Sequence, residues 1–184
     1  LPTPNINYNV NPIGLAIASG FTFVARGYSY DVRQLKDLIV AAVRHKGLAF
    51  LDVLQPCPTY NDINTRDWFS GEDRIDETTK KPMPRIYKLE DTDYDPVVHY
   101  SDETELNQKK TQAIVKSLEW DTKIPTGIFY KNELITPFTR RLTDKIPNYL
   151  ENPSALQKIS RDGKSITNID KILDSLNVEK TKNE

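Results

Sequence analysis

Residues 21–54, FTFVARGYSYDVRQLKDLIVAAVRHKGLAFLDVL, alternate between strand-forming and helix-forming segments. The run 21–25 is short, apolar and rich in β-forming residues, and the run 48–54 is apolar almost throughout. Between them, apolar residues recur at helical spacing, which predicts that they share one face: Val32, Leu35, Leu38, Ile39, Ala42 and Val43. This order predicts two parallel strands joined by a helix, with 48–54 buried on both faces of a sheet.

Capping signals mark the ends of the predicted elements. Asn11 and Pro12 favour a helix that begins there and ends at Gly20. Asp31 is typical of the residue that caps the second helix, and the segment 45–47 (HKG) ends it with cations and a glycine. The pair 26–27 (RG) is expected to end the first strand. Helix–strand–helix–strand order with short connections indicates half of an open parallel α/β sheet.

The pattern changes after residue 54. About 40 residues carry only short apolar clusters, and a loop of that length is expected to be functional or to wrap a partner. Further on, the sequence predicts these elements: a helix from Ser101 to about Trp120, a strand at 126–130, a short helix at 137–145, and weaker helices near 153–160 and 167–176. The resulting domain division is an α/β part, 1–61, and a loop-rich, helical extension, 62–184.

Composition excludes several classes of protein. The 184 residues carry a net charge of -1, which argues against a general nucleic-acid binder. No apolar run is long enough to span a membrane, and the start LPTPNINYNV lacks the features of a signal peptide. The single cysteine excludes an internal disulfide and a metal site made of this chain's cysteines alone. Residues 51–100 hold 6 basic and 11 acidic side chains, so this segment is expected to form loops or a solvated face.

Cys57 is the most informative candidate for chemistry. It lies in QPCPTYN, directly after the second predicted strand, where ligands gather in open α/β sheets. Pro56 and Pro58 restrict the backbone on either side and stiffen the presentation of the thiol. A rigid, soft ligand suits an iron–sulfur cluster or zinc. The alternative is a buried structural cysteine, which is a common state of this residue type.

Other candidate residues carry weaker signals. Arg26 follows a predicted strand and could meet an anion at the ligand edge, whereas Arg33 lies in the first turn of a helix; an ordinary surface position is the alternative for both. His45 is expected to be a helix cap or an exposed side chain rather than a base, and His99 has no evident partner. Asp121 belongs to no recognisable acid/base pair. The chain has no P-loop, no G-x-G-x-x-G and no G-x-S-x-G motif.

The segment FTFVARGYSYDVRQLKDLIVAAVRHKGLAFLDVLQPCPTYN (21–61) resembles the β subunit of archaeal 2-oxoacid:ferredoxin oxidoreductases, which are thiamine-diphosphate enzymes. The order FVAR-G, an Asp-capped helix, HKG and then DVLQPC-x-TYN carries the resemblance. It continues more weakly through IPTGIFYKNEL (124–134). The resemblance implies half of a thiamine-diphosphate-binding α/β fold, in the carboxy-terminal portion of such a subunit.

The same resemblance implies a role for Cys57 as the fourth ligand of a [4Fe–4S] cluster. The other three cysteines, and the Gly-Asp-Gly type segment that holds thiamine diphosphate and Mg²⁺, belong to an amino-terminal part that this sequence does not show. The implied reaction is CoA-dependent oxidative decarboxylation of a 2-oxoacid, pyruvate or 2-oxoglutarate, with electrons passed to ferredoxin. The implied partners are an α (or fused γ-α) subunit, the amino-terminal part of the β subunit and ferredoxin, in the cytoplasm. The chain alone is expected to be inactive.

Two other interpretations stay open. One is a non-catalytic interaction module that keeps the fold without cofactors and uses its acidic middle segment for docking. The other is a cluster-free thiamine enzyme of related fold, in which the PC-x-TYN segment would have no purpose.

Overall fold

The computed structural model describes residues 10–166. The chain forms two compact units, Leu1–Phe138 and Thr139–Glu184. The expected division at residue 61 between an α/β part and an extension stays a prediction, whereas the compact units that the structure shows divide after Phe138. None of the described helices is long and apolar enough to cross a bilayer.

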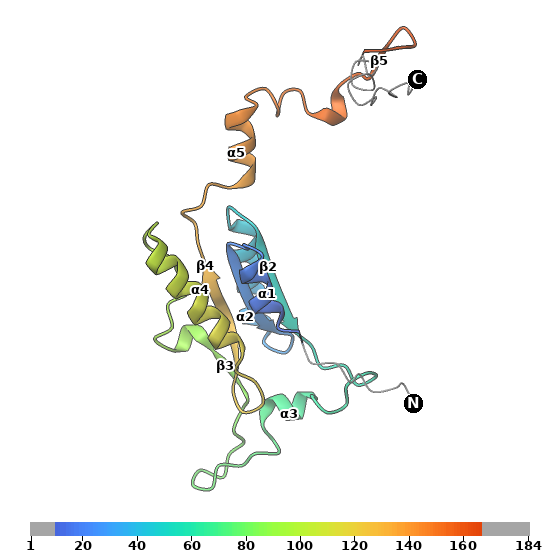
Figure 1. Cartoon of the computed structure of the whole chain (residues 1–184). Coiled ribbons are helices and arrows are strands. Elements are labelled where there is room, and N and C mark those ends of the chain that lie inside the picture. Colours follow the sequence, from blue (N-terminus) through green and yellow to red (C-terminus); the bar gives the residue numbers. More distant parts are fainter. Residues whose placement is uncertain (1–9, 167–184) are drawn as a thin grey trace, which may run out of the picture. The chain divides into compact units, whose positions relative to one another are not determined.

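The first unit is built on a four-stranded sheet with the order β2-β1-β4-β3 (Figure 1). Its strands are β1 (Phe23–Tyr28), β2 (Ala49–Leu54), β3 (Ile86–Lys88) and β4 (Ile124–Lys131). β1 and β2 are parallel, in a register that runs from Phe23 opposite Ala49 to Tyr28 opposite Leu54. The predicted parallel pair is therefore confirmed. β4 is antiparallel to β1 and parallel to β3, so the sheet is mixed but mostly parallel.

Helices cover both faces of this sheet. α1 (Pro12–Ala18) and α4 (Glu103–Ser117) pack on the face that carries Val24 and Phe129. α2 (Val32–Arg44) packs on the opposite face, against Phe23, Ala25 and Ile128. Neighbouring residues of one strand point to opposite faces, so β1 and β4 each contribute to both cores. This arrangement confirms the α/β class (Figure 1).

The helix ends follow local sequence signals. The Asn11 side chain accepts a hydrogen bond from the Gly14 N–H, and Pro12 is the first residue of α1. The Asp31 side chain caps α2 by accepting from the Gln34 N–H. These caps satisfy N–H groups that have no partner within the helix, as the sequence predicts.

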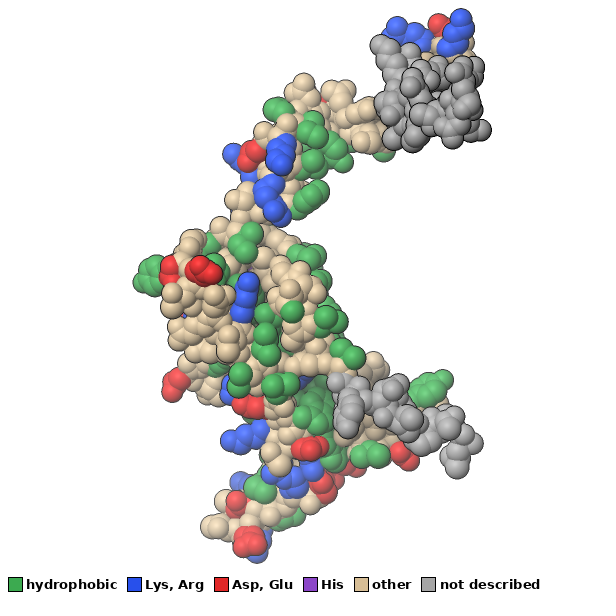
Figure 2. All heavy atoms as spheres, in the orientation of Figure 1, with side chains coloured by type: hydrophobic (Ala, Val, Ile, Leu, Met, Phe, Trp, Pro, Cys, Tyr) green, Lys and Arg blue, Asp and Glu red, His purple; other side chains and the backbone are tan. Residues whose placement is uncertain are grey.

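The expected single apolar face of α2 is only partly correct. Leu38 is buried against the sheet, but Val32 and Val43 are 70% and 81% exposed. Leu38, Ala41 and Ala42 pack against the sheet, whereas Val32, the first residue of the helix, and Val43, near its last, lie outside this contact. Hydrophobic side chains therefore remain at the surface of this unit, as the space-filling view shows for one of its faces (Figure 2).

The expectation that residues 48–54 form a strand buried on both faces is wrong for this chain. β2 is the last strand in the sheet order, its residues are mostly half-buried, and Val53 is 42% exposed. β2 pairs only with β1 among the described residues. An edge strand has one side without backbone partners, so its apolar residues have fewer neighbours to pack against.

The segment after β2 is more ordered than the predicted long loop. It holds α3 (Arg66–Ser70), β3 and the 3₁₀ turn η1 (Leu89–Asp91). Phe69 of α3 and Leu89 of η1 are both buried. The elements are short, so their apolar clusters carry too few residues to show a period in the sequence.

The second unit is described by itself. α5 (Phe138–Lys145) begins at the boundary between the units and confirms the short helix predicted at 137–145. The helix predicted near 153–160 is wrong: η2 (Ser154–Leu156) is followed by a small hairpin of β5 (Ser160–Arg161) and β6 (Lys164–Ser165). Gly163, at φ +73°, forms the turn of this hairpin, which the sequence D-G at 162–163 signals. The helix predicted at 167–176 lies outside the described residues.

Candidate functional site

Cys57 lies on an exposed turn three residues after the end of β2. β1 and β2 are parallel, so this turn follows the carboxyl end of a strand, as the sequence predicts. The thiol is exposed rather than buried, which excludes the interpretation of Cys57 as a buried packing residue. An exposed thiol at this edge is open to a ligand or to a partner chain.

The backbone around Cys57 forms a defined turn. Its carbonyl accepts a hydrogen bond from the Asn61 N–H at 2.8 Å, and the two residues form an isolated antiparallel bridge. The Asn61 side-chain oxygen accepts from the N–H groups of Ile63 (3.1 Å) and Asn64 (3.0 Å). Asparagine is well suited to this position because its short side chain can reach its own backbone two residues on. The segment QPCPTYN is thus a self-closed turn.

Helix α3 connects this turn to the sheet. The Thr65 hydroxyl caps α3 by accepting from the Trp68 N–H, and the Phe69 ring contacts the Tyr28 ring at the end of β1, at a centroid distance of 5.0 Å. The Arg85 guanidinium stacks 4.2 Å from the Trp68 ring and forms two hydrogen bonds with the Asp73 carboxylate. These bonds hold the pKa of Asp73 below its usual value. Sequence reasoning did not single out any of these anchoring residues.

Arg26 does not end its strand, contrary to expectation. β1 continues through Arg26 and Gly27 to Tyr28, and the Arg26 side chain is 4% exposed. Its Nε donates to the Asp52 carboxylate of β2 at 2.8 Å, and its guanidinium lies against the Phe129 and Trp120 rings. The anion that Arg26 meets is therefore a residue of the neighbouring strand. A charged residue within the apolar run 48–54 is the sequence signal for this pair.

His45 is a helix cap, as expected, but its side chain is fully buried. The ring Nε2 lies 2.7 Å from the Thr22 hydroxyl, and Nδ1 lies 3.8 Å from Glu133, too far for a hydrogen bond. Burial lowers the pKa of His45, and the opposing effect of the Glu133 carboxylate is smaller. His45 is thus a neutral structural residue at neutral pH.

This burial predicts a pH dependence of stability. The pKa of His45 in the folded chain is lower than in the unfolded chain, so the unfolded chain binds the additional proton. We expect the free energy of unfolding to fall as pH decreases below about 6.5, by at most about 1.4 kcal/mol per pH unit. Urea unfolding between pH 5 and 8 measures it. His45→Gln should flatten the curve in this window, while His99→Gln serves as the matched control; equal slopes in wild type and His45→Gln would contradict the assignment.

The remaining candidates do not converge on Cys57. The expectation that His99 has no partner is wrong: its Nε2 lies 2.9 Å from the Asp95 carboxylate, which also binds Lys109. These partners lower the pKa of Asp95 to about 2, with Lys109 contributing most. Arg33 is exposed on α2, as a surface arginine should be. Within residues 10–166, no group of three or more His, Cys, Asp or Glu side chains could hold a metal ion.

The sheet and the turn together define an α/β protein with an exposed cysteine at the carboxyl end of a parallel strand pair. The family described as the C-terminal part of the pyruvate ferredoxin oxidoreductase beta subunit matches residues 57–145. The "2-oxoacid:ferredoxin oxidoreductase subunit beta" of Saccharolobus solfataricus is 48% identical over 174 residues, covering 94% of this chain and 52% of the relative. The protein of the same name from a Sulfolobus species is 52% identical over 180 residues, covering 97% of this chain and 54% of the relative.

These matches place the chain in the family of β subunits of 2-oxoacid:ferredoxin oxidoreductases. The chain spans about half the length of the curated relatives it matches. A solved structure, "2-oxoglutarate:ferredoxin oxidoreductase from Magnetococcus marinus with 2-oxoglutarate, coenzyme A and succinyl-CoA bound", is similar with a TM-score of 0.56 and 20% identity. The match covers 96% of this chain and 48% of the solved chain, and this likeness supports the fold.

Proposed function

We propose that this chain acts as part of the β subunit of a 2-oxoacid:ferredoxin oxidoreductase and that Cys57 is one ligand of its [4Fe–4S] cluster. The exposed thiol on a closed turn after β2 carries the proposal. The reaction of the complete enzyme is CoA-dependent oxidative decarboxylation of a 2-oxoacid, with pyruvate and 2-oxoglutarate as the candidate substrates. The names of the relatives support the 2-oxoacid and ferredoxin parts of this proposal.

The donor chemistry of the turn fits a cluster ligand. Iron–sulfur clusters are held by cysteine thiolates, and Cys57 offers its sulfur at the surface, where a cluster held mainly by other residues could meet it. Cys57 is the single cysteine of the chain, and within the described residues no group of three or more His, Cys, Asp or Glu side chains could hold a metal ion. Its turn therefore fits one corner of a cluster, and the remaining ligands must come from outside this chain.

When bound, the cluster supplies a path for single electrons. The residues of this chain hold the turn and its thiol in place. The hydrogen bond from the Asn61 N–H to the Cys57 carbonyl closes the turn, and α3 anchors it through the Phe69–Tyr28 contact and through Arg85, which stacks on Trp68. None of the described residues is assigned to thiamine diphosphate or Mg²⁺, for which the proposal expects ligands elsewhere in the subunit.

Two exposed surfaces of this chain are available for contact with partner chains. One is the free edge of β2, where another strand could continue the sheet. The other is the apolar stripe of α2 formed by Val32, Ile39 and Val43. The proposed occupants are the amino-terminal part of the β subunit and the α (or fused γ-α) subunit. Both occupants would bury apolar surface that this chain leaves in water.

Anaerobic reconstitution tests the proposal. Iron and acid-labile sulfide are measured per chain in two samples: this chain alone, and a complete β subunit that contains it, assembled with its partner subunit. We expect no stoichiometric cluster on the chain alone, because it offers one thiolate where a [4Fe–4S] cluster needs four protein ligands. We expect about one cluster at this site in the assembly, together with 2-oxoacid-dependent reduction of ferredoxin.

Two results would contradict the proposal. A stoichiometric cluster on the isolated chain would mean that the ligands are not shared with other residues. An assembled complex without iron and without 2-oxoacid oxidation would instead support a non-catalytic interaction module of the same fold.

A further inference from the structure

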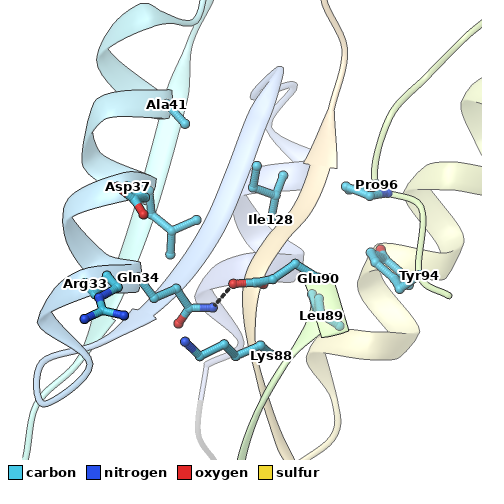
Figure 3. Close-up of a pocket in the computed structure, with 11 residues that line it drawn as sticks. Arg33, Gln34, Asp37, Ala41, Lys88, Leu89, Glu90, Tyr94, Pro96 and Ile128 are labelled. Atoms are coloured by element: carbon cyan, nitrogen blue, oxygen red, sulfur yellow. Dashed lines mark hydrogen bonds between the residues drawn. The ribbon is translucent and has the colours of Figure 1, made fainter. Parts of the chain in front are cut away.

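A cavity lies away from Cys57, on the face of the sheet that α2 covers only in part. It has a volume of about 450 Å³ and opens between α2 and the segment after β3 (Figure 3). This volume is in the range of small-molecule sites. Apolar groups form most of its lining: Leu38, Ala41, Leu89, Pro96 and Ile128. The cavity lies within the first compact unit.

A carboxylate is held in position at this cavity. Glu90 accepts a hydrogen bond from the Gln34 side-chain nitrogen at 2.6 Å (Figure 3). Its other oxygen lies over Gly127, which has a φ of +116°; a Cβ added there would be 2.5 Å from that oxygen. The glycine therefore makes room for the carboxylate. Within residues 10–166 Glu90 forms no direct ion pair, although its carboxylate, after that of Asp31, helps to raise the pKa of nearby Lys88.

The Gln34 side chain, which donates a hydrogen bond to Glu90, also carries an acceptor without a partner among the described residues. Gln34 is only 5% exposed, and its amide oxygen has no hydrogen-bond partner in the described part of the chain. A buried acceptor without a partner lowers stability, and such a group calls for an explanation. This oxygen points toward the side of the cavity where Lys88 lies (Figure 3).

Two cationic side chains, Lys88 and Arg33, also line the cavity. Lys88 is paired with Asp31 at 2.6 Å, which lowers the pKa of Asp31 and raises that of Lys88. Arg33 also lines the cavity and forms no ion pair within the described residues. Asp37 also lines the cavity and pairs with Lys36 at 3.2 Å, so Arg33, Lys36 and Lys88 against Asp31 and Asp37 leave one net positive charge. The cavity therefore offers one cation, Arg33, and one carboxylate, Glu90, that form no direct ion pair within the described residues.

We propose that this cavity binds a small zwitterion with an apolar body, namely an apolar α-amino acid. Its ammonium group, which has three donors, binds the Glu90 carboxylate and the Gln34 amide oxygen. Its carboxylate binds Arg33, and its side chain packs on Ala41 and Ile128. The site is separate from Cys57 and does not depend on the proposed function.

Titration with L-leucine, followed by methyl NMR of this chain, tests the proposal. We expect saturable shifts of the Ala41 and Ile128 methyl signals. Two comparators each lack one charge: 4-methylpentanoate has no ammonium group and 3-methylbutylamine has no carboxylate. Each should bind roughly tenfold more weakly or worse, because a charge-assisted hydrogen bond is lost.

Variants separate this site from non-specific binding. Glu90→Gln and Arg33→Ala should each weaken L-leucine binding roughly tenfold or more. Arg44→Ala is the matched control, because Arg44 is exposed on the same helix outside the cavity lining and should leave affinity unchanged. Both changed residues are exposed, so the variants should fold. The proposal is overturned by a lack of saturation up to about 10 mM, by comparators that bind as well as L-leucine, or by wild-type affinity in both variants.

Discussion

Replacing Cys57 by serine is expected to remove most of the iron at this site from the assembled enzyme while leaving the fold intact. A hydroxyl is a poor substitute for a soft thiolate as an iron ligand, and it stays protonated near neutral pH. Because Cys57 is exposed, the free energy of unfolding of this chain should change by no more than about 0.5 kcal/mol. The measurements are iron and sulfide per complex, ferredoxin reduction, and urea unfolding of the isolated chain.

Thr59→Ala is the matched control for this experiment, because it changes an exposed residue of the same turn without removing a sulfur. It should keep its iron. Measuring ferredoxin reduction separates a loss of electron transfer from a loss of decarboxylation. Decarboxylation of the 2-oxoacid could continue when electron transfer to ferredoxin is broken. Unchanged iron and unchanged ferredoxin reduction in Cys57→Ser would refute the ligand assignment.

The largest effect on stability is expected for Asp52→Ala. This change leaves the Arg26 guanidinium buried without its carboxylate partner, and removal of one member of a buried ion pair costs about 3–5 kcal/mol. Arg26 already has one buried nitrogen, Nη1, without a partner among the described residues, so it has little capacity to compensate. Urea unfolding followed by tryptophan fluorescence reports on this region, because Trp120 contacts the guanidinium.

Two further variants test the cause of this effect. Asp37→Ala breaks an exposed ion pair with Lys36 and should cost less than about 1 kcal/mol. The double variant Arg26→Met with Asp52→Ala should recover part of the lost stability, because no charge is then left buried without a partner. An Asp52→Ala chain within about 1 kcal/mol of wild type would show that Arg26 finds another partner or reaches water.

Local signals in the sequence explain the elements that were predicted correctly. Asn11 and Asp31 cap helices through hydrogen bonds that span three residues, so the information for each cap is contained in one turn. The parallel pairing of β1 and β2 follows from the helix between them, because a strand that returns through a helix lies parallel to the first. The turn after β2 was identified from its two prolines and its place at the strand end.

Contacts between distant segments explain the errors. The sequence indicated a loop where α3, β3 and η1 lie, because short elements that depend on Phe69 and Leu89 for burial show no period of their own. Arg26 was expected at the end of its strand, but pairing with Asp52 and the aromatic rings of later segments allows a charged residue within the sheet. His45 was expected to be a cap or an exposed side chain, and Thr22, on the segment before β1, helps to enclose its ring.

The sequence by itself determined the α/β class, the helix caps, the parallel strand pair and the place of Cys57, because each depends on residues that are close together in the chain. Only the tertiary structure decided which side chains are buried and which polar groups meet. The contacts of Glu90 with Gln34 and Gly127 are the clearest case, since they join a 3₁₀ turn, a helix and a strand that are far apart in the chain. No local pattern specifies these contacts, because they form only when β4 pairs with β1 and brings the segments that pack against β4 close to α2.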